Sequence, residues 1–245
     1  NNLLFTLSKK LNLFFVEHKS YIGGRYSVLS EVGIIPAYLM GINISKLRSK
    51  IFDCLRLENK DILKKGSLRL VNFLGSKKQN NLIFLNYAPE LEKFLYWCQQ
   101  LIAESLGKKN KGFLPVISNA PKDHHSLLQL YLDGPKDKIF NIFSFETAFK
   151  EKINIKKNLK INSFLNNKKI GVVKKAQKNA LIKAFKKKNI PFREFIVKSS
   201  REETLGQLFS YFMVETVVVG KLLKINPYNQ PAVEQVKLYT KKLLN

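Results

Sequence analysis

The sequence predicts an α/β fold, a three-layer α/β/α sandwich with a mainly parallel sheet. From residue 82 onward, short apolar runs of strand length alternate with longer segments of helical periodicity, the pattern of repeated β–α–β units. The short runs are apolar almost throughout, as expected of strands that are covered on both faces. The chain has 245 residues, of which 45% are hydrophobic, so it is long enough to bury a substantial core.

The part of the chain before residue 80 predicts helices and one short strand. Residues 11–18, LNLFFVEH, are expected to form a buried strand. A buried or half-buried helix is expected over residues 27–40, interrupted or restarted at Pro36. Residues 44–58 predict an amphipathic helix. Its apolar side would consist of Leu47, Ile51, Cys54 and Leu55.

The remaining elements follow in alternation. Strands are expected over residues 82–86, 112–118, 138–145 and 191–199, and helices over residues 90–106, 124–134, 167–188, 200–223 and 229–244. Gly107 is placed to end the first of these helices, followed by two lysines that suit the negative end of the helix dipole. Ser200 is a candidate N-cap, and Pro231 falls in the first turn of the last helix.

The domain boundary is expected at LGSKKQNN, residues 74–81, which is the most polar connection before the alternating region. The chain would then divide into residues 1–80 and residues 81–245. The opening stretch begins within an amphipathic pattern and not with Met, so the chain is expected to be the later part of a longer protein.

The net charge of +25 raises the question of nucleic-acid binding. Lysine makes up most of the excess and is spread widely, with the highest density over residues 149–188. Aromatic residues are not interleaved there as base-stacking platforms, and arginine, the usual reader of base edges, is scarce. The composition therefore argues against nucleic acid as the main partner.

Cysteine usage and hydropathy bear on the compartment. Cys54 and Cys98 lack the close spacing of a metal or redox motif and favour two buried thiols in a reducing cytoplasm over a disulfide. No apolar run reaches the roughly 20 residues of a membrane span, and no signal-peptide pattern is present. A cytoplasmic protein without a membrane partner is therefore expected.

Two charged residues in apolar surroundings are candidates for chemistry. Arg25 follows two glycines, which allow close approach of another group, and it would lie where free backbone N–H groups favour an anion. It could instead pair with a local carboxylate. Glu104 ends an apolar helix, where a partly dry carboxylate can serve as a base. It could equally be a surface residue at a helix end.

Two polar clusters complete the set of candidates. His124 and His125 point about 100° apart on a helix, so both cannot line one small site, and no spacing typical of zinc ligands accompanies them. Gln230, Glu234 and Lys237 share one face of the last helix, where a simple surface ion pair is the alternative. Ligands of parallel sheets bind at the carboxyl ends of strands, and these clusters fall near such ends or at helix termini.

Two long stretches, YIGGRYSVLSEVG and INPYNQPAVEQVK, resemble the two signature stretches of the glucose-6-phosphate isomerase family. The shorter ESLGK and DHHSLLQLYLDG lie between them in the order that this family shows. The resemblance runs over nearly the whole chain. It implies the sugar isomerase domain fold, with residues 1–80 as the tail of a first such domain with its connecting helices and residues 81–245 as the second.

The resemblance also implies an activity and a set of site residues. The family interconverts glucose 6-phosphate and fructose 6-phosphate through an enediol, in the cytoplasm, without a metal or other cofactor. Glu104 resembles the base, and Arg25, preceded by Gly24, resembles the arginine beside the reacting carbons. His125 resembles a ring-opening histidine that a homodimer shares between subunits. Lys237 and Gln230 resemble a ring-oxygen lysine and a substrate-contacting glutamine.

One feature of the family is not found before Gly23. The Ser/Thr-rich loop that holds the substrate phosphate has no counterpart there, so the chain is expected to lack it. Two other readings remain open. A sugar-phosphate-binding regulatory module of the same fold would lack a base, and a basic nucleic-acid-binding protein would shift duplex DNA in a salt-dependent way.

Overall fold

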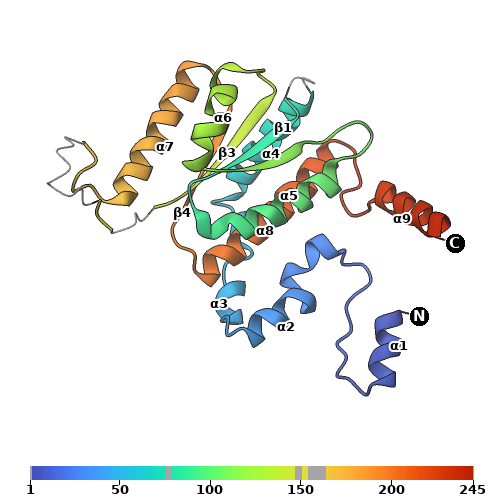
Figure 1. Ribbon diagram of the computed structural model, residues 1–245. Coiled ribbons are helices and arrows are strands. Elements are labelled where there is room, and N and C mark those ends of the chain that lie inside the picture. The colour runs from blue at the N-terminus through green and yellow to red at the C-terminus, as the bar shows by residue number, and fades with distance from the viewer. Residues whose placement is uncertain (1, 76–78, 147–150, 154–163, 245) are drawn as a thin grey trace.

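A four-stranded parallel sheet forms the centre of the computed structural model, which describes residues 2–75, 79–146, 151–153 and 164–244 (Figure 1). The strand order is β2-β1-β3-β4, and each neighbouring pair is parallel. The strands are β1 (Asn81–Asn86), β2 (Leu114–Asn119), β3 (Lys138–Phe145) and β4 (Phe192–Val197). The α/β class and the parallel sheet are thereby confirmed.

Helices cover both faces of the sheet (Figure 1). Helices α4 (Lys60–Gly75), α5 (Glu92–Leu106) and α8 (Glu202–Leu222) pack on one face, and helices α6 (Lys122–Asp133) and α7 (Ile170–Lys187) pack on the other. Successive residues of β1 enter opposite cores, Phe84 with the first set of helices and Leu85 with the second. Because both faces of the two central strands, β1 and β3, are buried, their sequences lack polar alternation, as the sequence predicted.

The direction of the helices fixes which side chains meet. Helix α5 begins beside the carboxyl ends of β1 and β2, where Asn119 donates to the Glu92 carboxylate at 2.7 Å. It then runs back, antiparallel to the strands. Its last turn, which contains Glu104, therefore lies at the end of the sheet where the strands begin. The first turn of α6, with His125, follows the carboxyl end of β2. Glu104 and His125 therefore lie at opposite ends of the strands.

The buried strand expected over residues 11–18 is wrong. These residues are all described: residues 11 and 12 form a turn after α1 (Leu3–Lys10), and residues 13–18 are irregular and without strand pairing. Phe14 is 93% exposed. Apolar residues alone do not make a strand, because the ladder needs a neighbouring chain to satisfy its backbone groups. No strand of the described sheet lies beside this segment.

The helices expected before residue 60 are broken into shorter pieces. A 3-10 turn, η1 (Gly24–Leu29), precedes α2 (Glu31–Leu39), which includes Pro36 and has no buried residue. Residues 44–58 form α3 (Ile44–Arg48) and η2 (Asp53–Leu55), not one helix. The backbone carbonyl of Leu47 occupies the space where a side chain of Gly206 would lie, so this segment presses directly on α8 and bends to follow it.

Several details of the later elements differ from prediction. The N-cap position of α8 is Arg201, not Ser200, and α4 was not predicted although it contributes Leu70 to the core. Gly107 ends α5, and Pro231 opens α9 (Pro231–Leu244), as predicted. The two cysteines are buried free thiols, also as predicted. Residues 76–78, within the expected domain boundary, lie outside the described residues, and the division of the chain stays a prediction.

Candidate active site

Arg25 is the centre of a buried polar network that joins three distant parts of the chain. It lies in η1 and is 3% exposed. Its carboxylate partner is Glu104 of α5, with 3.3 Å between Arg25 Nη1 and Glu104 Oε2. The local carboxylate considered from the sequence is therefore not its partner. The third part is the connection between α8 and α9, whose Pro227 and Asn229 carbonyls accept from Nη2 at 2.7 and 3.1 Å.

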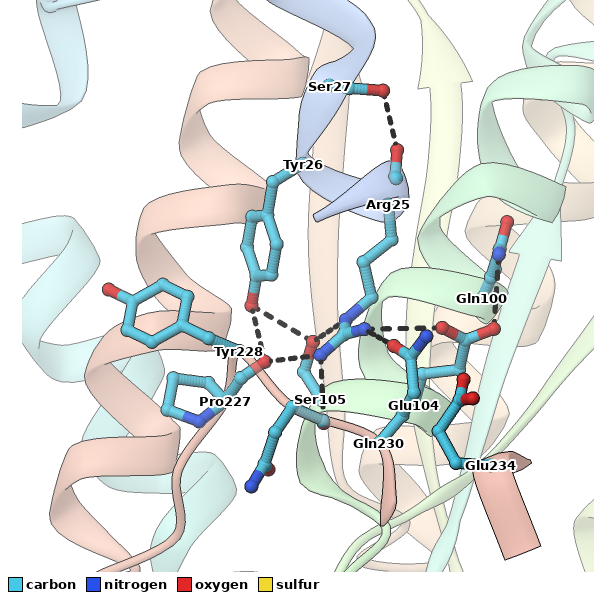
Figure 2. A network of polar contacts seen from close by, with 12 residues as sticks. Arg25, Tyr26, Ser27, Gln100, Glu104, Ser105, Pro227, Tyr228, Gln230 and Glu234 are labelled. Carbon is cyan, nitrogen blue, oxygen red and sulfur yellow. Dashed lines mark hydrogen bonds and ion pairs between the residues drawn. The ribbon is translucent and has the colours of Figure 1, made fainter. Parts of the chain in front are cut away.

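The guanidinium has two differently occupied sides (Figure 2). On one side, Nε donates to Ser105 Oγ at 2.8 Å, and the Tyr26 hydroxyl lies 2.9 Å from the same oxygen. On the other side, Nη1 donates to both Glu104 and the Gln230 amide oxygen. All N–H groups of Arg25 are thus engaged, which offsets the cost of burying its charge.

Glu104 faces open space, unlike Arg25. Its side chain is 29% exposed, and its second oxygen accepts from Gln100 Nε2, one helical turn earlier, at 3.1 Å. The helix stops at Gly107, where a Cβ would lie 2.6 Å from the Ala103 carbonyl. The carboxylate is therefore fixed by both neighbours and still reachable from outside, as a base must be.

A cavity of about 1010 Å³ opens beside this carboxylate. Its lining combines the end of α5, the following lysine-rich turn and the entry to α9, and includes Glu104, Lys108, Asn226, Asn229 and Gln230. The Lys108 ammonium bridges the backbone carbonyls of Ser105 and Asn226 at 3.1 and 2.6 Å, and burial lowers its pKa. Lys108 therefore ties the two helix ends together at the cavity wall.

The predicted face of α9 is only partly brought to this site. Gln230 contacts Arg25 and lines the cavity, as does the start of α9. Lys237 lies further along the helix, its side chain is 64% exposed, and its ammonium pairs with Glu234 at 2.8 Å. All residues of α9 are described and none is buried, so the helix projects from the body (Figure 1).

The two histidines have different surroundings, and neither joins the Arg25 network. His124 Nε2 lies 2.7 Å from the Tyr87 hydroxyl, and burial lowers the pKa of His124. His125 is exposed. Because α6 starts at the opposite end of the strands from the end of α5, His125 lies away from the Arg25 network within this chain.

Gly24 and three unpredicted residues complete the description. Gly24 is exposed, and nothing lies within 4 Å of where its Cβ would be, so the space beside Arg25 is open. Ser105, Tyr26 and Pro227 were missed. A signal existed for two of them, since Ser105 adjoins Glu104 and Tyr26 adjoins Arg25, but neither hydroxyl has a sequence pattern that reveals burial.

The described residues include no group of three or more His, Cys, Asp or Glu side chains placed to hold a metal ion. Nor does any described helix combine the length and apolar character that a membrane span requires. The side chains at the cavity place a carboxylate beside a buried cation and an amide.

Comparison with known proteins identifies relatives over most of the chain. No family model matches it. The glucose-6-phosphate isomerase of Methanocaldococcus jannaschii is 34% identical over 224 residues, which cover 88% of this chain and 54% of the relative. The glucose-6-phosphate isomerase of Mycoplasmopsis synoviae is 34% identical over 251 residues, with 96% and 56% covered. The chain thus spans about half the length of these curated relatives.

A solved structure has the same fold. The hypothetical protein TT0462 from Thermus thermophilus superposes with a TM-score of 0.89 at 26% sequence identity, covering 99% of this chain and 60% of that one. The similarity therefore includes the segments before the sheet as well as the sheet and its helices.

Proposed function

The chain belongs to the glucose-6-phosphate isomerase family, and we propose that it carries the proton-transfer machinery of an aldose–ketose isomerase acting on glucose 6-phosphate and fructose 6-phosphate. The observation that carries the proposal is the Arg25–Glu104 pair at the cavity. A reachable carboxylate lies 3.3 Å from a cation that is buried behind it. A reaction that removes a proton next to a carbonyl needs this combination of a base and a fixed positive charge.

In this proposal Glu104 moves one proton between two carbon atoms. It takes the proton from C2 of the open-chain aldose and returns it to C1, while the hydroxyl proton of O2 passes to O1. One carboxylate suffices, because the same group is base in the first step and acid in the second. The hydrogen bond from Gln100 to the other oxygen supports this role by fixing the carboxylate plane.

Arg25 is proposed to stabilise the enediolate that forms between these steps. Its guanidinium supplies a fixed positive charge beside the place where the negative charge of the enediolate develops. Since Nη1 is shared with Gln230, the substrate oxygen would take the place of the Gln230 amide oxygen. Gly24 leaves open space on this side, which supports close approach of a sugar.

His125 and Lys237 are proposed to assist ring opening, the histidine from the second subunit of a homodimer. The shared site is supported by the position of α6. This helix starts at the opposite end of the strands from the last turn of α5, which separates His125 from Glu104 within one subunit. Lys237 would act after its ion pair with Glu234 is broken, and both side chains are exposed enough for this exchange.

The substrate phosphate is proposed to bind outside residues 1–245. The lysines that line the cavity support this idea, because Lys108, Lys109 and Lys111 already bind backbone carbonyls of residues 223–226. Remote phosphate binding orients the reacting carbons, so its loss costs rate as well as affinity. Residues 1–245 alone are accordingly expected to be essentially inactive, and near-normal turnover by this segment in a coupled assay would contradict the proposal.

The proposal is tested by Glu104→Gln in the full-length protein. The amide keeps the shape of the side chain but cannot take a proton, so turnover should fall by about 10²–10⁴-fold. Exchange of the C2 hydrogen with solvent should fall in parallel, while substrate binding persists. Glu58→Gln, an exposed glutamate away from the cavity, is the matched control. If the C2 hydrogen exchanged in Glu104→Gln as fast as in the wild type, another group would be the base.

The shared site has its own test. Subunits carrying Glu104→Gln and subunits carrying a His125→Ala change are each expected to be nearly inactive. After subunit exchange, one site of each mixed dimer regains both wild-type residues, so part of the activity should return. If exchange is demonstrated by mass and no activity returns, His125 does not act across the interface.

A further inference from the structure

Hydrogen bonds from the protein fix one side of the Arg25 guanidinium, and the other side faces the cavity. We propose that Ser105 and Tyr26 are positioning residues that set this orientation. The inference rests on the proposed isomerase function for its consequence in catalysis. The contacts that support it are properties of the folded chain itself.

The hydroxyl groups of Ser105 and Tyr26 form a closed ring with Arg25. Arg25 Nε donates to Ser105 Oγ at 2.8 Å, and the Tyr26 hydroxyl donates to the Pro227 carbonyl at 3.2 Å. Ser105 Oγ and Tyr26 Oη are 2.9 Å apart. Because the single hydroxyl hydrogen of Tyr26 is used on Pro227, the hydrogen between the two hydroxyls must come from Ser105. Arg25 Nη2 closes the ring by donating to the same Pro227 oxygen at 2.7 Å.

Burial makes this ring rigid. Ser105 is 0% exposed and Arg25 is 3% exposed, so no bulk water can replace a lost partner. Burial also raises the pKa of Tyr26, which keeps its phenol protonated and able to donate at neutral pH. Removing the Ser105 hydroxyl would leave the buried Nε–H unpaired, which carries the full cost of a buried donor without a partner. Rotation of the guanidinium would be the cheapest way to relieve that cost.

The hydrogen bonds of this ring determine which guanidinium nitrogen of Arg25 can contact a ligand. Nε is bound to Ser105, and both hydrogens of Nη2 are bound to backbone carbonyls of Pro227 and Asn229. Nη1 is left, and its partners are the Glu104 and Gln230 side chains that line the cavity. Arg25 can therefore approach a substrate oxygen through Nη1, directly beside the base. Figure 2 shows this division, with Ser105, Tyr26 and Pro227 on one side and Glu104 and Gln230 on the other.

The backbone of Arg25 is also fixed by a hydrogen bond, which limits how the residue can move when the ring is lost. The Trp97 indole N–H donates to the Arg25 carbonyl at 3.1 Å. With the main chain fixed, loss of the ring should change the direction of the guanidinium and not the location of the residue. The expected defect is in the chemical step, since misplacement of a reacting group by about 1 Å can cost about 100-fold in rate.

The test uses Ser105→Ala and Tyr26→Phe in the full-length protein. Both should lower kcat by about 10- to 100-fold with KM changed by less than about threefold. Ser105→Thr, which keeps a hydroxyl, should recover most of kcat. Ser67→Ala is the matched control, because Ser67 is also 0% exposed but its hydroxyl has no hydrogen-bond partner among the described residues. Unchanged kcat in both Ser105→Ala and Tyr26→Phe, or an equal loss in Ser67→Ala, would overturn the inference.

A second measurement does not depend on isomerase activity. The ¹⁵N–¹H signal of Arg25 Nε should exchange slowly with solvent in the wild type and much faster in Ser105→Ala. If the wild-type protein lacks isomerase activity, the proposed function fails, and this exchange alone decides whether the ring positions Arg25. Equal exchange in the two proteins would overturn the inference whatever the activity.

Discussion

Two buried arginines in this molecule are paired with glutamates in opposite settings. Arg25 is 3% exposed and its partner Glu104 has a side chain that is 29% exposed at a cavity. The side chain of Arg193 in β4 is 8% exposed, and its partner Glu215 in α8 is 2% exposed. The ion type is the same, and the difference lies in whether the carboxylate can be reached from outside.

In the second pair the Glu215 carboxylate is almost fully buried. The Arg193 guanidinium donates to both Glu215 oxygens at 2.5 and 3.2 Å and to Asn141 Oδ1 at 2.9 Å, and the Tyr211 hydroxyl donates to Glu215 at 2.9 Å. A carboxylate so buried can stabilise the packing of α8 on the sheet but cannot exchange a proton with a substrate. Glu104, by contrast, keeps lone pairs toward the cavity. Accessibility of the carboxylate, and not the presence of the pair, distinguishes a candidate site from a structural contact.

The largest expected difference between the two pairs is in stability. Glu215→Ala leaves the Arg193 charge buried without a counter-ion, so the free energy of unfolding should fall by about 3–5 kcal/mol. Glu104→Ala should lower it less, by about 1 kcal/mol, since water from the cavity can take the place of the partly exposed carboxylate and Arg25 keeps its other acceptors. Urea denaturation of both variants measures the comparison. Equal losses would mean that the exposure of Glu104 has no energetic consequence.

A double replacement sharpens the interpretation of the Arg193–Glu215 pair. Arg193→Met combined with Glu215→Leu removes both charges while filling much of the same volume, and such replacements are often neutral or stabilising. The double variant should therefore unfold within about 2 kcal/mol of the wild type and be more stable than Glu215→Ala. A double variant less stable than the single one would show that the charges themselves, and not only their balance, stabilise the fold.

Two glycines give a smaller contrast between the same regions. A Cβ on Gly66 of α4 would lie 2.7 Å from Glu215 Oε1, whereas nothing lies within 4 Å of one on Gly24. Gly66→Ala should thus cost about 1–2 kcal/mol of stability through overpacking. Gly24→Ala should change stability by less than about 0.5 kcal/mol. Thermal unfolding of the two variants tests this, and a stable Gly66→Ala protein would show that α4 can move away from the pair.

The smallest expected effect concerns a neutral contact, Tyr87–His124, whose contribution to stability should depend on pH. Because burial lowers the pKa of His124 in the folded state, the unfolded chain binds the proton more readily. Stability is then full above the unfolded value of about 6.5 and falls as the pH drops below it. Unfolding of the wild type and His124→Gln between pH 7 and pH 5 should show a steeper loss in the wild type. Parallel curves would mean that the contact does not depend on the neutral histidine.

The sequence by itself determined the elements whose signals are local. The strand over residues 138–145 and the helix ending before Gly107 were predicted within a residue or two, because apolar run length and a helix-ending glycine act on neighbouring residues. Arg25, Glu104 and Gln230 were singled out by their types and short motifs, and the structure brings these three together. The roles of His125 and Lys237 stay predictions.

Only the tertiary structure showed which side chains are in contact and which are buried. Residues 11–18 have the composition of a strand but no neighbouring strand among the described residues, so pairing could not be read from their pattern. Arg25 and Glu104 are separated by 79 positions, and Arg193 and Glu215 by 22, with nothing in either spacing to indicate contact. Exposure of a carboxylate depends on every element packed around it. For that reason the sequence could single out Glu104 as a candidate, but it could not show that this carboxylate is reachable while that of Glu215 is buried.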